Sequence, residues 1–166
     1  MFDDIYQDEN GDMQFNGHTG YLNFWPLFLE ALEPTDPRFT SLVEKLTDPD
    51  FGMRTPYGIA SMSKNDPYYK MGDNYWTSPI WMNINFLIVK SLYGYSKNEK
   101  VPEDLREHIK ESYESLRTDL INMIVNDYTD TGFIWEVYND DTGAGMDNHP
   151  FTGWSALVAN LLAEVY

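Results

Sequence analysis

The chain has 166 residues and a mass of 19.3 kDa, the size of one domain or of part of a larger one. It carries 27 acidic and 11 basic side chains, a formal net charge of −16, which argues against nucleic acid and anionic membrane surfaces as partners. It contains no cysteine, so disulfides, thiolate metal sites and cysteine nucleophiles are excluded. Aromatic residues make up 16% of the chain, which indicates either a bulky core or a surface where aromatic faces meet a ligand.

The first half of the chain predicts an acidic lead-in followed by two helices. Residues 1–19 are polar and acidic, and we expect them to form a loop. Residues 25–32 are apolar on nearly every side, which is typical of a buried helix. Asp36 and Pro37 are typical of a helix start. The helix that they begin has an apolar stripe on one side only, as a surface helix does: Phe39, Leu42, Val43 and Leu46.

Residues 48–77 are rich in proline, glycine and aromatic residues, and this segment is too long for a structureless connection. We therefore expect it to be functional. Ser78 and Pro79 then predict the start of a second buried helix that runs to about Tyr93.

A long amphipathic helix is expected from Pro102 to about Asn126, with Gly132 after its end. Residues 133–138 predict a short extended segment, and residues 153–165 predict the last helix. The loop between them is acidic, and solvation is a better explanation of its carboxylates than cation binding: Asp140, Asp141 and Asp147.

Buried and surface helices alternate along the chain, which is typical of two concentric layers of helices. Strand signals are too few for a sheet, so we expect an all-α fold. An ordinary globular helical bundle gives the same pattern, and periodicity alone does not separate the two architectures.

The candidate chemistry lies in carboxylates among aromatic residues, because serine-hydrolase, phosphate-loop and zinc-protease motifs are all absent. Tyr75 and Trp76 lie just before a buried helix, and Glu136 lies between Trp135 and Tyr138. A glutamate flanked by rings is partly desolvated and suits proton transfer, while pyranose rings stack on aromatic faces. The alternative is an edge segment whose apolar residues fill the core while Glu136 points to solvent. On the residues alone this alternative is the better supported of the two.

Three longer motifs occur in order: Tyr75-Trp76-x-x-Pro79-Ile80-Trp81-x-Asn83-x-Asn85, Gly132-Phe133-x-Trp135-Glu136-x-Tyr138 and His149-Pro150-Phe151-Thr152-Gly153-Trp154-Ser155. In this order and at these intervals they resemble the C-terminal end of glycoside hydrolase family 63. The resemblance spans about residues 17–166. It implies that residues 20–166 are the C-terminal part of an (α/α)6 barrel.

The resemblance implies an inverting hydrolase that removes the terminal α-1,2-linked glucose from glucosylated high-mannose oligosaccharide during N-glycan processing. Glu136 falls on the general-base position of the family. Tyr75, Trp76 and Trp154 fall on sugar-contacting positions, and His149 is assigned to the same substrate site. The mechanism requires no metal and no organic cofactor. The implied compartment is the lumen of the endoplasmic reticulum, although the chain carries no targeting signal.

Two departures from the family pattern concern the substrate and the acid. Thr77 and Ser78 stand where the family has Arg-Gly, and Val137 stands where it has Gln. The family's general acid is an Asp in an upstream motif that has no counterpart here. We therefore expect the last part of a barrel, completed by the remainder of the domain and inactive alone. The alternatives are a non-catalytic carbohydrate-binding remnant and a related family hydrolase of small glucosides or mannosides.

Overall fold

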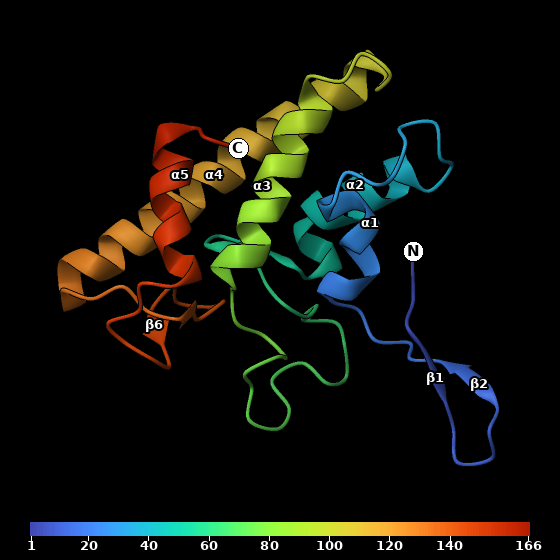
Figure 1. Cartoon of the computed structure of the whole chain (residues 1–166), viewed down its shortest axis with the longest axis horizontal. Coiled ribbons are helices and arrows are strands. Elements are labelled where there is room, and N and C mark those ends of the chain that lie inside the picture. The colour runs from blue at the N-terminus through green and yellow to red at the C-terminus, as the bar shows by residue number, and fades with distance from the viewer.

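The computed structural model describes residues 1–166 and is mostly helical (Figure 1). The helices are α1 (Trp25–Phe28), α2 (Phe39–Thr47), α3 (Met82–Ser96), α4 (Glu103–Thr131) and α5 (Val158–Ala163). Three short 3-10 turns accompany them, at Tyr21–Phe24, Pro49–Phe51 and Trp154–Leu157. None of the helices is both long enough and apolar enough to cross a membrane.

The strands form three separate antiparallel pairs and no larger sheet. They are β1 (Ile5–Gln7) with β2 (Met13–Phe15), β3 (Arg54–Thr55) with β4 (Gly58–Ile59), and β5 (Val137–Tyr138) with β6 (Gly145–Met146). The expectation of a mostly helical chain with too few strands for a layered sheet is confirmed.

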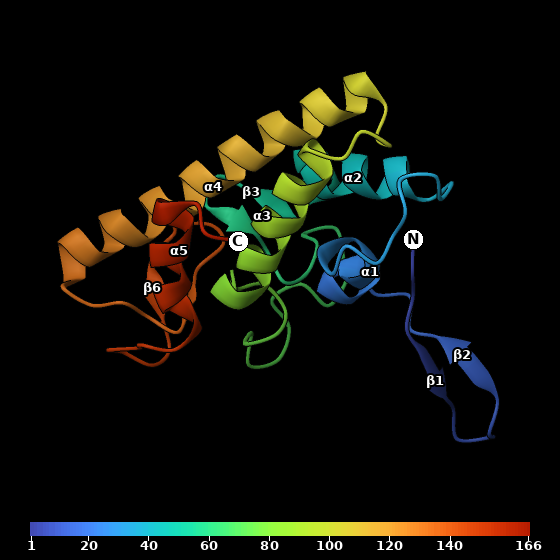
Figure 2. The same cartoon turned by 45° about the horizontal axis from the view of Figure 1, so that its top comes forward.

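Helix α3 lies centrally and contacts α1, α4 and the turn that precedes α5. Helix α4 runs along the outside from α2 to α5 (Figure 2). The buried side of α4 consists of Ile109, Tyr113, Leu116, Leu120, Met123 and Ile124, as expected of an amphipathic helix. The stripe predicted on α2 is buried at Phe39, Leu42, Val43 and Leu46. The one-sided burial of both helices therefore agrees with the amphipathic pattern.

Helix α3 begins later than Ser78 and Pro79 predict. The backbone N–H of Ile80 donates to the carbonyl of Tyr138 at 2.8 Å, and the N–H of Tyr138 donates back to Ile80 at 3.1 Å. This pairing holds Ile80 in an extended conformation, so the helix cannot begin before Met82. Pairing with Tyr138, which is distant in the sequence, therefore overrides the helix start that Ser78 and Pro79 predict.

Other helix ends also differ from the sequence expectation. Helix α1 stops at Phe28, well before residue 32, and Glu30 follows with a left-handed φ of 54°. Asp36 accepts the N–H of Arg38 at 2.9 Å, and α2 starts only at Phe39. Helix α4 continues past Asn126 and ends where Gly132 adopts a φ of 77°, a conformation that glycine supplies at little steric cost.

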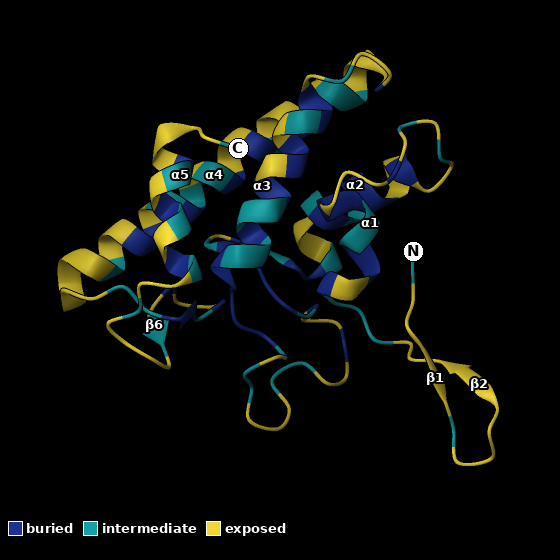
Figure 3. Ribbon diagram, in the orientation of Figure 1, coloured by how far each residue is buried: buried dark blue, intermediate teal, exposed yellow.

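The expectation that residues 1–19 form a loop is wrong. The segment contains the hairpin β1–β2, which stands away from the helices and is exposed along its length (Figures 1 and 3). The carboxylate of Asp8 closes the turn, because it accepts the N–H groups of Asn10 at 2.9 Å and Asp12 at 3.0 Å. Strands of three residues are too short for the alternation of side chains to reveal them in the sequence.

The buried amide of Asn85 joins α3 to the hairpin β3–β4. The residue is 0% exposed. Its Oδ1 accepts the N–H of Ile59 at 2.8 Å, and its Nδ2 donates to the Ile59 carbonyl at 2.9 Å. Nδ2 also lies within hydrogen-bond distance of the Trp81 carbonyl and the Tyr21 hydroxyl, each at 3.0 Å. These contacts fix the N-terminal end of α3, from which the aromatic site is built.

Candidate active site

Glu136 lies immediately before β5 and is only 6% exposed. Its Oε1 accepts a hydrogen bond from the hydroxyl of Tyr75 at 2.8 Å, and its Oε2 accepts one from the side-chain amide of Asn148. The backbone of Glu136 is fixed as well, because its carbonyl accepts the indole N–H of Trp154 at 2.7 Å. The carboxylate is therefore oriented by two donors and does not point into bulk solvent.

Three tryptophans form a stack beside this glutamate. The ring of Trp76 lies on that of Trp81 with centroids 4.4 Å apart and planes 9° apart. Trp154 lies 5.6 Å from Trp81 at an angle of 30°. Trp81 is 4% exposed between its two neighbours, whereas Trp76 is 65% exposed. The stack thus offers an open indole face on a support that is itself buried.

Tyr75 connects the tryptophan stack to the carboxylate. Its ring meets Trp76 and Trp81 edge-on, at centroid distances of 5.1 and 4.7 Å. Burial of the hydroxyl and the nearby charge of Glu136 raise the pKa of Tyr75 to about 12. Tyr75 therefore keeps its proton at neutral pH and acts as a donor to Glu136.

The stack lines a cavity of about 770 Å³. Its aromatic wall consists of Tyr21, Trp25, Tyr75, Trp76, Trp81 and Trp154. Its polar lining includes Asp4, Asn16, His18, Asn23 and Asn83. Aromatic faces combined with a few placed polar groups are typical of a site for a small organic ligand.

The predicted site residues fall into two groups. Tyr75, Trp76 and Trp154 line the aromatic cavity, and Glu136 lies behind them, bonded directly to Tyr75 and Trp154. His149 does not line this cavity. It is exposed, and its ring packs on Trp135 with a centroid distance of 3.8 Å.

The acidic loop after Glu136 is less solvated than the sequence predicts. Asp140 is 0% exposed, and its Oδ2 accepts a hydrogen bond from the hydroxyl of Tyr69. Asp141 is exposed, as expected. Asp147 is exposed, but desolvation of its carboxylate, followed by the charges of Glu136 and Asp73, raises its pKa. The chain contains no cluster of three or more acidic or histidine side chains suited to a metal ion.

Two contributors to the site were not identified from the sequence. Trp81 reads as one more apolar residue of a buried helix, yet it is the centre of the tryptophan stack. Asn148 reads as the end of a solvated loop, yet its amide holds Glu136. The only available signal for Trp81 was its place in the motif with Tyr75 and Trp76, and no signal marked Asn148.

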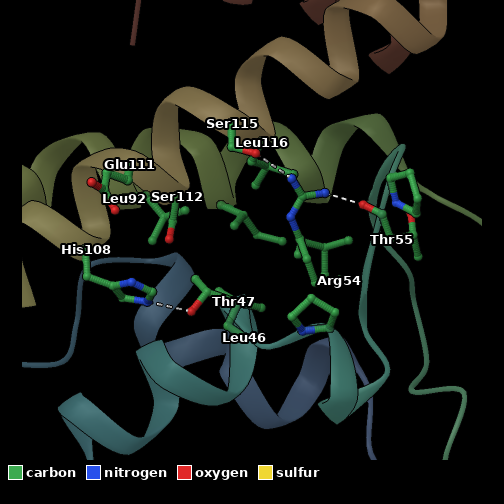
Figure 4. Close-up of a pocket in the computed structure, with 14 residues that line it drawn as sticks. Leu46, Thr47, Arg54, Thr55, Leu92, His108, Glu111, Ser112, Ser115 and Leu116 are labelled. Carbon is green, nitrogen blue, oxygen red and sulfur yellow. Dashed lines mark hydrogen bonds between the residues drawn. The ribbon is translucent and has the colours of Figure 1, made fainter.

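A second cavity, of about 450 Å³, lies among α2, α3, α4 and the hairpin β3–β4 (Figure 4). Two of its polar side chains already have partners. His108 lies 2.9 Å from the hydroxyl of Thr47, and Arg54 contacts Thr55, Ser115 and Asp119. None of the predicted site residues lines this cavity, so it does not compete with the aromatic cavity as the candidate active site.

Comparison with known proteins identifies the family. The sequence model of the glycosyl hydrolase family 63 C-terminal domain matches residues 4–164. The chain belongs to this family. The family 63 match includes the hairpin β1–β2, beside which Asp4 and Asn16 contribute to the aromatic cavity.

The family 63 chain is similar to larger curated proteins. It is 41% identical over 150 residues to a probable mannosyl-oligosaccharide glucosidase of Schizosaccharomyces pombe, covering 90% of this chain and 18% of that protein. It is 35% identical over 154 residues to a mannosyl-oligosaccharide glucosidase of Arabidopsis thaliana, with the same two coverages, 90% and 18%. The chain therefore spans about a fifth of the length of these relatives.

A solved structure of the same family supports the fold. The family 63 mannosylglycerate hydrolase of Thermus thermophilus, determined in complex with glucose, matches with a TM-score of 0.59 and 21% sequence identity. The match covers 90% of this chain and 30% of that one. The present chain thus shares the arrangement of its helices with one part of this larger glycoside hydrolase.

Proposed function

We propose that the chain is the C-terminal part of the (α/α)6 barrel of an inverting α-glucosidase. The proposed reaction removes the terminal α-1,2-linked glucose from a glucosylated high-mannose oligosaccharide in N-glycan processing. Membership of a glycoside hydrolase family supports the hydrolase class, and the relatives named as mannosyl-oligosaccharide glucosidases support the substrate class. The compartment that fits this reaction is the lumen of the endoplasmic reticulum.

The observation that carries the proposal is the bonding of Glu136 within the aromatic site. Inverting hydrolysis uses a carboxylate base that activates water on one side of the sugar, with a carboxylic acid about 6.5–9.5 Å away on the other. Glu136 is buried among aromatic residues, and Tyr75 and Asn148 fix both of its oxygens. In the proposed step, water attacks the anomeric carbon, its proton passes to Glu136, and the glycosidic oxygen leaves.

The leaving oxygen needs a proton from a second carboxylic acid. We propose that the remainder of the barrel, outside this chain, supplies this general acid. On this proposal the isolated chain has no glucosidase activity, because only one of the two required carboxyl groups is in place.

The aromatic cavity supplies the proposed binding of the sugar. The exposed face of Trp76 suits stacking of a pyranose ring, and Tyr75 and Trp154 complete the wall beside Glu136. His149 packs on Trp135 and does not line the cavity, so we do not assign it a contact with the stacked ring.

A second candidate is hydrolysis of a small glucoside or mannoside, and two observations favour it. The Thermus relative in the same family is a mannosylglycerate hydrolase. In addition, Thr77 lines the cavity at a position where the family motif has arginine, so the side chain offered to a ligand differs there from the family pattern. The third possibility is a non-catalytic carbohydrate-binding role, which the experiment must distinguish from the two hydrolase activities.

The test is glucose release by the full-length protein that carries this chain. Proton NMR should show β-glucose as the first product from a glucosylated mannose oligosaccharide, since inversion converts the α-linkage. The isolated 166-residue chain serves as the inactive comparison. α-Glucose as the first product would contradict inversion. Turnover of mannosylglycerate alone would establish the second candidate, and binding of oligosaccharide without turnover would establish the third.

A further inference from the structure

A cluster of charged side chains lies beside the aromatic site and plays no part in the proposed reaction. We refer to Tyr69, Lys70 and Asp140, together with Lys64 and Asp141, as the anchor cluster. Nζ of Lys70 lies 3.4 Å from Oδ1 of Asp140 and also contacts Asp141. Nζ of Lys64 lies 2.7 Å from Oδ1 of Asp141 and 3.9 Å from Asp140. Two carboxylates and two ammonium groups are thus joined in one network.

Asp140 is the buried centre of the anchor cluster. It is 0% exposed, and its Oδ1 has no hydrogen-bond partner, so the charge of Lys70 is the compensation available to that oxygen. A buried carboxylate that loses its partners is strongly destabilising, since its charge can be neither solvated nor paired. Burial and the adjacent Asp140 raise the pKa of Tyr69 to about 12, so its hydroxyl stays a donor at neutral pH.

The anchor cluster joins two segments that meet at the active site. Lys70 begins a loop that closes on itself, because its N–H donates to the carbonyl of Thr77 at 3.2 Å. This loop, residues 70–77, carries Tyr75 and Trp76. Asp140 follows β5, only four residues after Glu136. The ionic contacts therefore connect the base of the aromatic loop to the segment that carries the proposed catalytic carboxylate.

We propose that Asp140 is a positioning residue that fixes the loop 70–77 through Tyr69 and Lys70. Its role is to keep the Tyr75 hydroxyl on Glu136 and the Trp76 indole in the cavity wall. The effect on turnover rests on the proposed function, whereas the anchoring of the loop does not.

The anchoring is tested by hydrogen–deuterium exchange in the full-length protein that carries this chain. In Asp140→Asn, amides of residues 71–77 should exchange about tenfold faster or more, while those of α4 keep their rates. The matched control is Asp130→Asn, which removes an exposed carboxylate outside the anchor cluster and should change exchange in the loop less than about twofold. Unchanged exchange in the loop, or an equal rise throughout the protein, would overturn the proposal.

If Asp140→Asn does not fold, Tyr69→Phe provides the milder variant, because it removes only the hydroxyl that donates to Asp140. It should raise exchange in residues 71–77 about threefold or more, the lower end of the effect of losing one hydrogen bond. Exchange in residues 71–77 equal to that of the unsubstituted protein would again contradict the proposal that Asp140 fixes this loop.

A double-substitution cycle on turnover separates positioning from general stability. If Asp140 acts through Tyr75, Asp140→Asn should lower kcat about tenfold in the unsubstituted protein but less than about twofold in a Tyr75→Phe background. Equal losses in both backgrounds would contradict this role. Absence of activity in the unsubstituted protein would contradict the proposed function alone. The exchange experiment would then test by itself whether Asp140 fixes the loop 70–77.

Discussion

The hydroxyl of Tyr75 donates a 2.8 Å hydrogen bond to Oε1 of Glu136, although the two residues lie 61 positions apart in the chain. Tyr75 belongs to the aromatic loop before α3, and Glu136 belongs to the segment after α4. Their contact places an oriented carboxylate next to a stack of tryptophans. It is the link on which both the proposed chemistry and the proposed role of Asp140 depend.

Replacing Glu136 with glutamine should abolish most turnover in the full-length protein. The substitution keeps the size of the side chain and removes the proton acceptor. We expect kcat to fall by about 10²–10⁴, the usual contribution of one general acid–base group, with little change in KM. Steady-state kinetics on a glucosylated oligosaccharide measures both constants.

The matched control for this substitution is Glu114→Gln on the exposed side of α4, which should leave kcat within about twofold. A loss of turnover in the control equal to that in Glu136→Gln would show that neutralising any glutamate is enough. Retention of full kcat in Glu136→Gln would remove Glu136 from the reaction.

Replacing Trp76 with alanine should weaken substrate binding without unfolding the protein. The indole is 65% exposed, so its loss removes little of the core, but it removes the open stacking face. We expect KM to rise about 3- to 10-fold, in line with the energy of one aromatic stack. Tyr128→Ala, which removes another exposed ring on α4, is the control and should not change KM. A lower melting temperature with unchanged KM would assign Trp76 to the core.

Replacing Asn85 with alanine should destabilise the fold strongly. The side chain lies within hydrogen-bond distance of four partners, and alanine leaves the buried N–H of Ile59 without its acceptor, while the Ile59 carbonyl keeps the hydroxyl of Tyr21. We expect a loss of about 2–4 kcal/mol in the free energy of unfolding, measured by urea denaturation. Asn122→Ala on the exposed side of α4 should cost less than about 0.5 kcal/mol. Equal losses in both variants would show that the network around Asn85 contributes nothing specific.

Replacing Asp147 with asparagine should stabilise the protein at neutral pH. Desolvation of its carboxylate, together with the charges of Glu136 and Asp73, raises the pKa of Asp147 above its ordinary value of 3.8, although the residue is exposed, so the folded state holds its proton more tightly than the unfolded state. The stability that this proton provides is present below pH 3.8 and is lost as pH rises through the folded pKa. The variant should therefore melt at a higher temperature than the parent at pH 7.

The control for Asp147→Asn is the same comparison at pH 3, where the charge difference disappears. Asp147 has a left-handed φ of 64°, which asparagine also tolerates well, and any benefit from this source does not depend on pH. An increase in melting temperature that is equal at pH 3 and pH 7 would therefore contradict the electrostatic explanation.

The isolated chain should expose more apolar surface than an ordinary monomer. Large apolar side chains are exposed at Met13, Phe15, Leu22, Leu29, Trp76, Leu162 and Val165. If the remainder of a barrel covers part of this surface, the chain alone should exceed the about 300–600 Å² patch of a typical monomer. We expect it to self-associate or to bind a hydrophobic dye. A monodisperse monomer that melts cooperatively and binds no dye would contradict this prediction.

The sequence by itself determined the helices whose signals are local. The apolar stripes of α2 and α4 follow from residues within one or two helical turns.

Only the tertiary structure decided the features that depend on distant partners. Pairing with Tyr138 holds Ile80 extended and delays the start of α3. Tyr69 and Lys70 make burial of Asp140 possible, although its acidic neighbours in the sequence indicated a solvated loop. Similarly, the packing that brings the aromatic loop against β5 decided which partner Glu136 has. A hydrogen bond between residues 61 positions apart leaves no trace in the periodicity of either segment, because each periodicity reports only on its own neighbours.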